Sequence, residues 1–168
     1  MRMPVASKAG KRARRRFSFR GNTCADDILI GNHGNASLSA RGHFHLSGIL
    51  YMLDGKAEFT IEGSGQITFT GKCKHLVIKK SHGDCIIDFS ELKSDLITCE
   101  SLSGQVTVVI GKARRVDIIE MIEDALLRIN SNPLVTAHCL DHNARIVCSP
   151  SYQPPLVVRS FKRIRTGL

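Results

Sequence analysis

The sequence predicts an all-β protein, folded as a single-stranded right-handed parallel β-helix of about five or six short coils with non-helical basic tails. Three observations lead to this prediction. Short apolar segments alternate with polar residues at period two, pairs of small or polar residues separate these segments, and the pattern returns about every 20 residues. Such short strands with short turns leave no room for the helical crossovers of an open parallel sheet. A fixed period of this length favours a solenoid whose coils stack on one another.

The repeat is clearest between residues 59 and 148. Its turn pairs have second residues that lie 18, 21, 20 and 19 positions apart, and they are Ser64-Gly65, His82-Gly83, Ser103-Gly104, Glu123-Asp124 and His142-Asn143. Two apolar or cysteine residues follow each turn at alternate positions: Ile67/Phe69, Cys85/Ile87, Val106/Val108, Leu127/Ile129 and Ile146/Cys148. We expect these residues to point into the core, and glycine to occupy corners where the backbone needs a positive φ.

Two structural alternatives stay open. An antiparallel sandwich of many short strands also has turn signals every 8 to 12 residues. Within residues 116–129, apolar residues also recur at the spacing of an amphipathic helix. The register of the repeat instead predicts strand, turn and strand for this segment, with Glu123-Asp124 replacing a glycine-containing pair.

The chain divides into a flexible basic arm at residues 1–20, a β-helix domain at 21–150, and a proline-containing linker with a basic C-terminal segment at 151–168. The arm has few apolar residues, so we expect it to be disordered unless a partner binds it. We expect segments 23–32 and 154–161 to cover the two ends of the solenoid, because open strand edges are templates for further pairing.

Positive charge gathers at the two ends of the chain. Residues 1–20 and 159–168 hold twelve of the 24 Lys and Arg residues, whereas all fifteen acidic residues lie within 21–150. Such tails suit contact with a polyanion or with a second copy of the chain. The run KRARRR at 11–16 is the strongest functional signal, because basic residues that neutralise phosphates release counterions. Phe17 and Phe19 follow this run, where aromatic rings would stack on unpaired bases.

The predicted polyanion-binding residues are Lys8, Lys11, Arg12, Arg14, Arg15, Arg16, Arg20, Lys162, Arg163 and Arg165.

No catalytic, cofactor or metal site is predicted. His43 and His45 share one face of a strand, as do Cys73 and His75, but a zinc site needs about four convergent ligands. A carboxylate pair near Asp84 would suit a polysaccharide-cleaving β-helix, but such enzymes usually build a cleft from long loops, and the turns here are short. A carbohydrate-active enzyme is therefore a third reading behind two non-enzymatic ones.

The cysteines indicate a reducing compartment. Six occur at irregular spacing without a C-x-x-C pair, and the chain shows neither a cleavable apolar leader nor an apolar run of membrane-spanning length. We expect a cytoplasmic protein without a membrane span, in which most thiols are small core side chains.

Three corner motifs, EGSGQITFTG (62–71), SHGDCIIDFSELKSD (81–95) and SLSGQVTVVIG (101–111), resemble the bacterial autotransporter adhesin head family, or GIN domain. That family repeats S-G-S-G-D-[VI] corners and S-x-L-K-[AS]-D stretches in a right-handed parallel β-helix. The resemblance covers roughly residues 34–134. It implies this fold but brings no catalytic residues, and the family's usual export signal does not occur here.

A weaker resemblance links the chain to bactofilins, which are small cytoplasmic β-helices with flexible tails that polymerise end to end. The G-N-I corner repeats of bactofilins are missing here. From both the residues and the resemblance, we expect a non-catalytic structural or scaffolding protein that forms homo-oligomers and contacts an acidic partner through its basic termini. The alternative is a nucleic-acid-binding or packaging protein, similar to a capsid subunit, that uses the arginine-rich arm.

Overall fold

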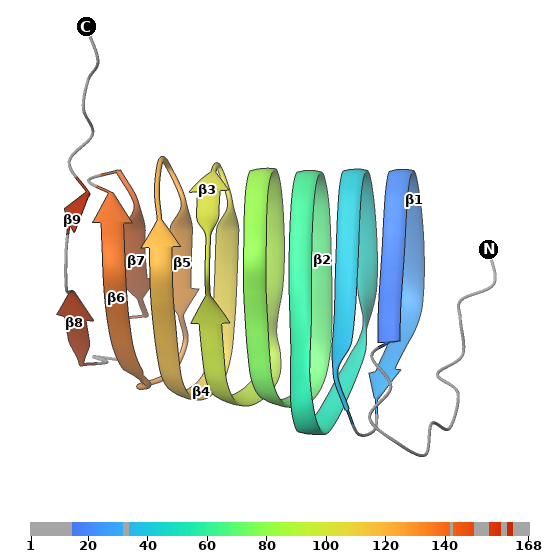
Figure 1. Ribbon diagram of the computed structural model, residues 1–168, viewed down its shortest axis with the longest axis horizontal. Helices are drawn as coiled ribbons and strands as arrows, with labels where there is room; N and C mark the ends of the chain where they lie inside the picture. The colour runs from blue at the N-terminus through green and yellow to red at the C-terminus, as the bar shows by residue number, and fades with distance from the viewer. Residues whose placement is uncertain (1–14, 32–33, 142, 150–154, 159–160, 163–168) are drawn as a thin grey trace, which may run out of the picture.

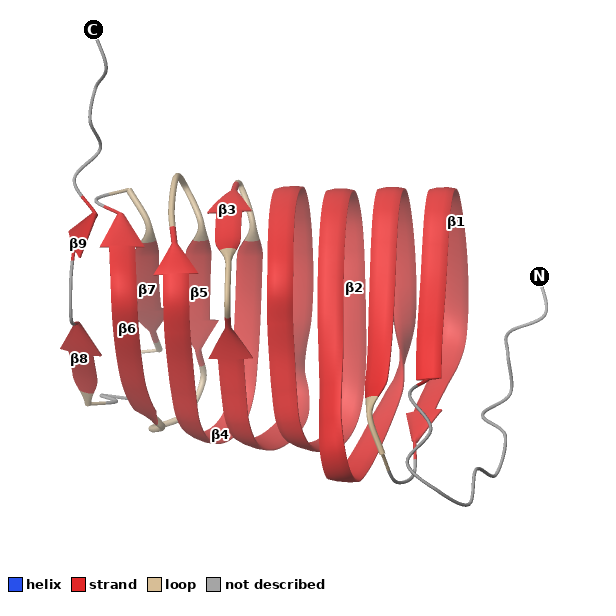
Figure 2. Ribbon diagram, in the orientation of Figure 1, coloured by secondary structure: helices blue, strands red, loops and turns tan. Residues whose placement is uncertain are grey.

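The computed structural model describes residues 15–31, 34–141, 143–149, 155–158 and 161–162, and Figure 1 shows these residues wound into a parallel β-solenoid. The solenoid has about seven turns rather than the predicted five or six. Strand covers most of the described residues and no helix occurs among them (Figure 2). Consequently, none of the described segments is a helix with the length and apolar character needed to span a membrane.

The nine strands are β1 (Arg15–Gly31), β2 (Ala36–Cys99), β3 (Leu102–Gly104), β4 (Thr107–Met121), β5 (Leu126–Ile129), β6 (Leu134–Asp141), β7 (Arg145–Cys148), β8 (Leu156–Val158) and β9 (Phe161–Lys162). All pairings between these elements are parallel, which excludes the antiparallel sandwich. The strand β2 continues through several corners over 64 residues, so each of its coils wraps fully around the core.

The length of a coil varies between 19 and 21 residues along the chain. Arg15 pairs with Ala36, 21 positions later, but after an irregularity between Ala25 and Ile28 the step is 20. Beyond a second irregularity, between Phe89 and Lys93, the step falls from 21 to 19. It is 21 again where β6 pairs with β8 and β9. These steps bracket the period of about 20 that the sequence predicts.

One corner of the solenoid, at the top of Figure 1 where β3 ends, is a column of glycines. All its members have positive φ, and we call Gly21, Gly42, Gly63, Gly83 and Gly104 the glycine corner. A Cβ atom on Gly63 would lie 2.1 Å from the carbonyl oxygen of Gly42 in the coil below. The close stacking of coils therefore excludes every other residue at this position.

Segment 116–129 is strand, turn and strand, as the repeat predicts. Strand β4 ends at Met121, a turn follows at Glu123-Asp124, and β5 begins at Leu126. Glu123 has a φ of 60° and so takes the conformation that glycine has in the earlier coils. The helical alternative is wrong because the pairing of β4 and β5 with their neighbours fixes an extended backbone.

The core runs along the axis between a front wall, which holds β6 and β8, and a back wall, which holds β5 and β7 (Figure 1). Eight of the ten predicted inward residues have at most 1% of their surface exposed, whereas Ile146 and Cys148 are half-buried. At the centre, the ring of Phe59 lies 5.6 Å from that of Phe69 and 5.2 Å from that of Phe89, both edge to face. Each such buried side chain contributes about 1.5–3 kcal/mol by leaving water.

The solenoid extends further toward the N-terminus than predicted. Strand β1 begins at Arg15, so residues 15–20 belong to the first coil and the predicted boundary at residue 20 is wrong. Phe17 and Phe19 are 6% and 7% exposed and join the core, which removes them as platforms for base stacking. Segment 23–31 completes this coil by pairing in parallel with β2, and residue 32 lies outside the described residues.

The predicted end cover at 154–161 also continues the repeat where it is described. Strands β8 and β9 pair in parallel with β6, so they begin one more coil.

Candidate functional site

Of the ten predicted polyanion-binding residues, the structure brings together three, Arg15, Arg16 and Arg20, in β1. Lys162 lies in β9, but its side chain is not described. The other six lie outside the described residues, and they are Lys8, Lys11, Arg12, Arg14, Arg163 and Arg165.

The arginines of β1 are held on regular structure. Arg16 and Arg20 point outward and alternate with the buried phenylalanines of the same strand. Arg20 pairs in register with Arg41 of the next coil, whose Nε lies 3.3 Å from Glu62 Oε2. The guanidinium of Arg15 donates a hydrogen bond to the carbonyl oxygen of Gly31. These three arginine side chains therefore project from a regular strand of the solenoid and not from a flexible arm.

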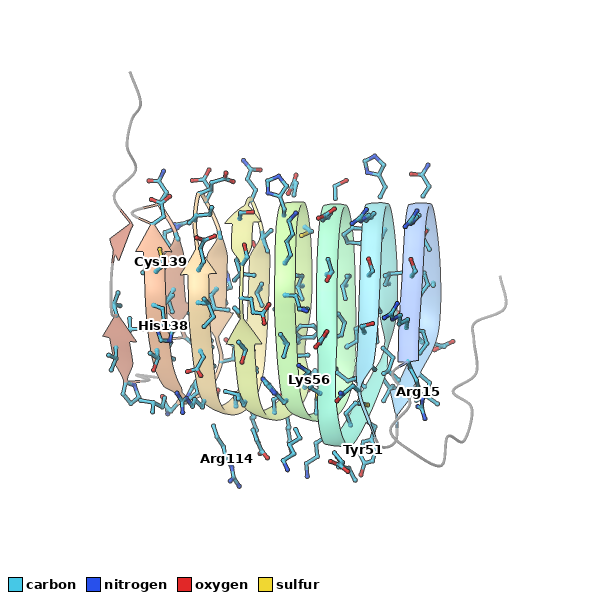
Figure 3. All side chains as sticks on the ribbon, in the orientation of Figure 1. Arg15, Tyr51, Lys56, Arg114, His138 and Cys139 are labelled. Atoms are coloured by element: carbon cyan, nitrogen blue, oxygen red, sulfur yellow. The ribbon has the colours of Figure 1, made fainter. Side chains whose placement is uncertain are left out.

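A second basic surface lies at the corner opposite the glycine corner, at the bottom of Figure 3 near the labelled Arg114. A groove of about 580 Å³ follows this corner. Five basic residues line it, and we call Lys72, Lys74, Lys93, Lys112 and Arg114 the lysine corner. None of these five residues is among those predicted from the sequence to bind a polyanion.

The lysine corner is built from one repeated three-residue unit. The units are Lys72-Cys73-Lys74, Lys93-Ser94-Asp95 and Lys112-Ala113-Arg114. In each unit the outer two residues are exposed while the middle one is buried or half-buried. Lys93 pairs directly with Lys112, and neighbouring strands lie about 4.8 Å apart. The result is a row of lysines, one from each of three coils.

The charges of this corner are poorly compensated. Asp95 is the one acidic residue that lines the groove among the described residues, and its Oδ1 lies 3.7 Å from Arg114 Nε. Within the described part of the chain, none of the four lysines forms an ion pair. Like charges placed side by side on neighbouring strands destabilise a sheet. Folding therefore gives no reason for this row.

Lysines elsewhere on the front wall are paired. Lys56 Nζ lies 2.9 Å from Glu58 Oε1, and Lys79 Nζ lies 3.8 Å from the other oxygen of the same carboxylate. Lys80 Nζ lies 2.8 Å from Glu62 Oε1. The contrast makes the lysine corner unusual within this molecule rather than typical of its lysines.

The floor of the groove consists of small side chains, one of which carries a hydroxyl without a partner among the described residues, and its one thiol is not ionised near neutral pH. Burial raises the pKa of the Cys73 thiol to about 11, so the thiol stays protonated near neutral pH. Ser94 is 7% exposed, and its Oγ has no hydrogen-bond partner among the described residues. Cys73, Ser94 and Ala113 are all small, which leaves space between the flanking charged side chains.

Exposed apolar residues continue the lysine corner toward the N-terminal end. Tyr51 and Leu53 are 49% and 48% exposed and occupy the coil before Lys72 and Lys74 (Figure 3). Ile49 and Leu29, which pair in register on the back wall, are exposed next to them. The corner therefore changes from apolar to basic along the axis.

Histidines make structural hydrogen bonds on the outer surface. The Nε2 atom of His75 lies 3.0 Å from the Thr98 hydroxyl, and Nδ1 of His43 lies 2.5 Å from the Ser64 hydroxyl. Partial burial lowers the pKa of His75, helped by the nearby charge of Lys56. No group of three or more His, Cys, Asp or Glu residues converges as a metal site would require, within the residues that the structure describes.

No protein-family model matches the chain, and no curated protein or solved structure matches it either. The function is therefore inferred from the side chains of this molecule. A sequence signal for the lysine corner did exist, because Lys72, Lys93 and Lys112 are separated by 21 and 19 positions, which are both coil lengths of this solenoid.

Proposed function

We propose that the protein is a non-catalytic structural β-helix, a scaffold that self-associates and holds an acidic partner on its basic surfaces. The observation that carries this proposal is that basic side chains stand in rows on regular β-structure, at Arg16 and Arg20 and again at the lysine corner. A rigid row of cations at fixed spacing suits an extended acidic partner better than a small substrate. The basic termini add further positive charge to the chain.

Exposed apolar residues support self-association. Leu29 and Ile49 lie on the first two coils, and Leu156 and Val157 lie in β8 on the last described coil. Each of the four has about half of its surface exposed, between 48% and 59%. Apolar residues at both ends of a solenoid suit contact between copies, because association removes them from water.

A cytoplasmic location is part of the proposal, and the six cysteines support it because none of them forms a disulfide. The likeness of the corner motifs to GIN domains or bactofilins stays a prediction, and the function proposed here does not depend on it. The alternative function, nucleic-acid binding, gains support from the lysine corner.

The test combines oligomeric state with polyanion affinity. The full chain is compared with an arm variant, in which Lys8, Lys11, Arg12 and Arg14 are replaced by Gln. We expect light scattering to give a multiple of the 18.5 kDa chain mass for both proteins at low and high salt. We expect the arm variant to elute from a heparin column at lower salt than the natural chain. A monomer that passes through the column at low salt would contradict the proposal.

A further inference from the structure

We propose that the lysine corner is a binding groove for single-stranded nucleic acid, which lies along the axis of the solenoid with its phosphates against the lysines. This inference rests on the proposed function in requiring an acidic partner. It names the class of that partner and places it on a surface separate from the basic termini.

The spacing of the charges carries the first step. Lys72, Lys93 and Lys112 come from three successive coils, so the row spans roughly 10 Å along the axis. Phosphates of a stacked strand are about 3.4 Å apart along its axis, so the row faces about three of them. The paired lysines of the front wall have carboxylates as partners, whereas these lysines have none among the described residues.

The shape of the corner carries the second step. Lys72, Lys93 and Lys112 flank the groove on one side. Lys74, Asp95 and Arg114 flank it on the other side, where the net charge is still positive because Asp95 is the one acidic residue among them. Small residues form its floor, so a chain-like ligand can lie between the two rows. An acidic membrane is a broad surface that favours a convex contact, and the concave arrangement therefore favours a polymer.

Tyr51 carries the third step, because it distinguishes a nucleic acid from other linear polyanions. Its side chain is half exposed and lies in the coil next to Lys72, at the end of the basic row. A base of a strand whose phosphates contact the lysines reaches this ring, and stacking of bases on aromatic side chains needs no particular sequence. The hydroxyl of Ser94, which has no hydrogen-bond partner among the described residues, adds a donor beneath the same row.

The experiment measures binding of a fluorescent oligothymidylate of about 15 nucleotides to the full chain by anisotropy, between about 50 and 200 mM NaCl. The corner variant replaces Lys93 and Lys112 with Gln. A matched wall variant replaces Arg128 and Arg145 with Gln, which removes the same charge from exposed residues of β5 and β7 outside the groove. Circular dichroism verifies that both variants are folded.

We expect the corner variant to bind at least about tenfold more weakly than the wall variant. The slope of log affinity against log salt should fall in magnitude by about 1.4, because each lost phosphate contact removes about 0.7 for a single strand. We expect Tyr51→Leu to weaken oligonucleotide binding by about 5- to 100-fold through lost stacking, without affecting the binding of inorganic polyphosphate.

Equal affinity of the corner and wall variants would overturn the groove. Equal loss of polyphosphate and oligonucleotide binding in Tyr51→Leu would overturn the assignment to nucleic acid, as would tight binding to phosphatidylserine vesicles without oligonucleotide binding. The arm variant separates this failure from that of the proposed function. Binding that depends on the arm alone would contradict the groove but agree with a scaffold that holds an acidic partner. A natural chain that binds no polyanion would contradict both proposals.

Discussion

The glycine corner and the lysine corner lie on opposite sides of the same solenoid, yet their residues affect folding in opposite ways. At Gly63 and Gly83 of the glycine corner, positive φ and a carbonyl oxygen of the preceding coil, 2.1 Å from an added Cβ, leave room for glycine alone. At the lysine corner, the side chains are exposed, and the backbone makes no comparable demand. Their like charges stand in register and oppose the stacking of coils.

The difference distinguishes residues that the fold requires for stability from residues that it does not require. A repeated residue that relieves a steric conflict is explained by stability, and it says little about function. A repeated residue that adds electrostatic repulsion needs another explanation. Ligand binding is the simplest explanation for a row of lysines that form no ion pair among the described residues. Substitutions at the two corners should therefore change different properties.

The largest effect should come from Gly63→Ala. A methyl group there meets the carbonyl oxygen of Gly42 at 2.1 Å, and the φ of 131° is itself strained for alanine. We expect a loss of about 3 kcal/mol or more in the free energy of unfolding, measured in urea.

Gly21→Ala is the matched control in the same column. Gly21 also has positive φ, but an added Cβ has nothing within 4 Å. Its cost should be about 1 to 2 kcal/mol, from backbone strain alone. Similar losses in the two variants would show that contact between coils does not determine the glycine column.

A smaller effect of opposite sign is expected for Glu123→Gly. Glu123 continues the glycine column at a φ of 60°, where an L-residue is strained. The backbone N–H of Glu123 donates a hydrogen bond to Asp141 Oδ2. The substitution leaves this bond unchanged, because no side-chain atom of Glu123 takes part in it. We expect a gain of about 0.5 to 1 kcal/mol by urea unfolding, since relief of strain exceeds the added flexibility of glycine. A loss of stability would mean that the Glu123 side chain stabilises the turn.

The smallest effect on stability concerns Glu62, which precedes Gly63. Its carboxylate pairs with Arg41 and Lys80, whereas the lysines of the lysine corner have no such partner among the described residues. A hydrogen bond from Lys80 is the main cause of the lowered pKa of Glu62, and the charges of Lys80 and Arg41 act in the same direction. Its contribution is present above the ordinary pKa of 4.5 and is lost as pH falls through the lower, folded value.

Glu62→Gln should therefore unfold a few tenths of a kcal/mol more easily at pH 7, and the difference should vanish in acid. Urea unfolding at several pH values measures this difference. A variant that keeps the same deficit at about pH 3 would rule out ionic pairing as the cause.

The sequence was sufficient to predict the solenoid because its core and its glycine corner repeat for the same physical reason. Ile67, Phe69 and their counterparts recur because every coil must bury its inward side chains against the next. The turn at Glu123 was also predictable, since the register holds where the glycine does not.

The first coil and the lysine corner were missed for different reasons. The arginines of the segment RRFSFR predict a basic arm, but the segment is a strand whose phenylalanines point inward at alternate positions. Its signal was Gly21, which lies one coil length of 21 residues before Gly42. The spacing of the lysines changes from 21 to 19 at the irregularity before Lys93, so the row follows no single period. Which side chains share a groove depends on that local change, and composition does not reveal it.

The most direct test measures stability and binding together in the corner variant, Lys93→Gln with Lys112→Gln. If these lysines serve a ligand and not the fold, the urea midpoint at low salt should stay the same or rise, because repulsion is removed. Oligonucleotide affinity should fall at least about tenfold in the same preparation. A variant that unfolds more easily and binds as tightly as the natural chain would contradict the account.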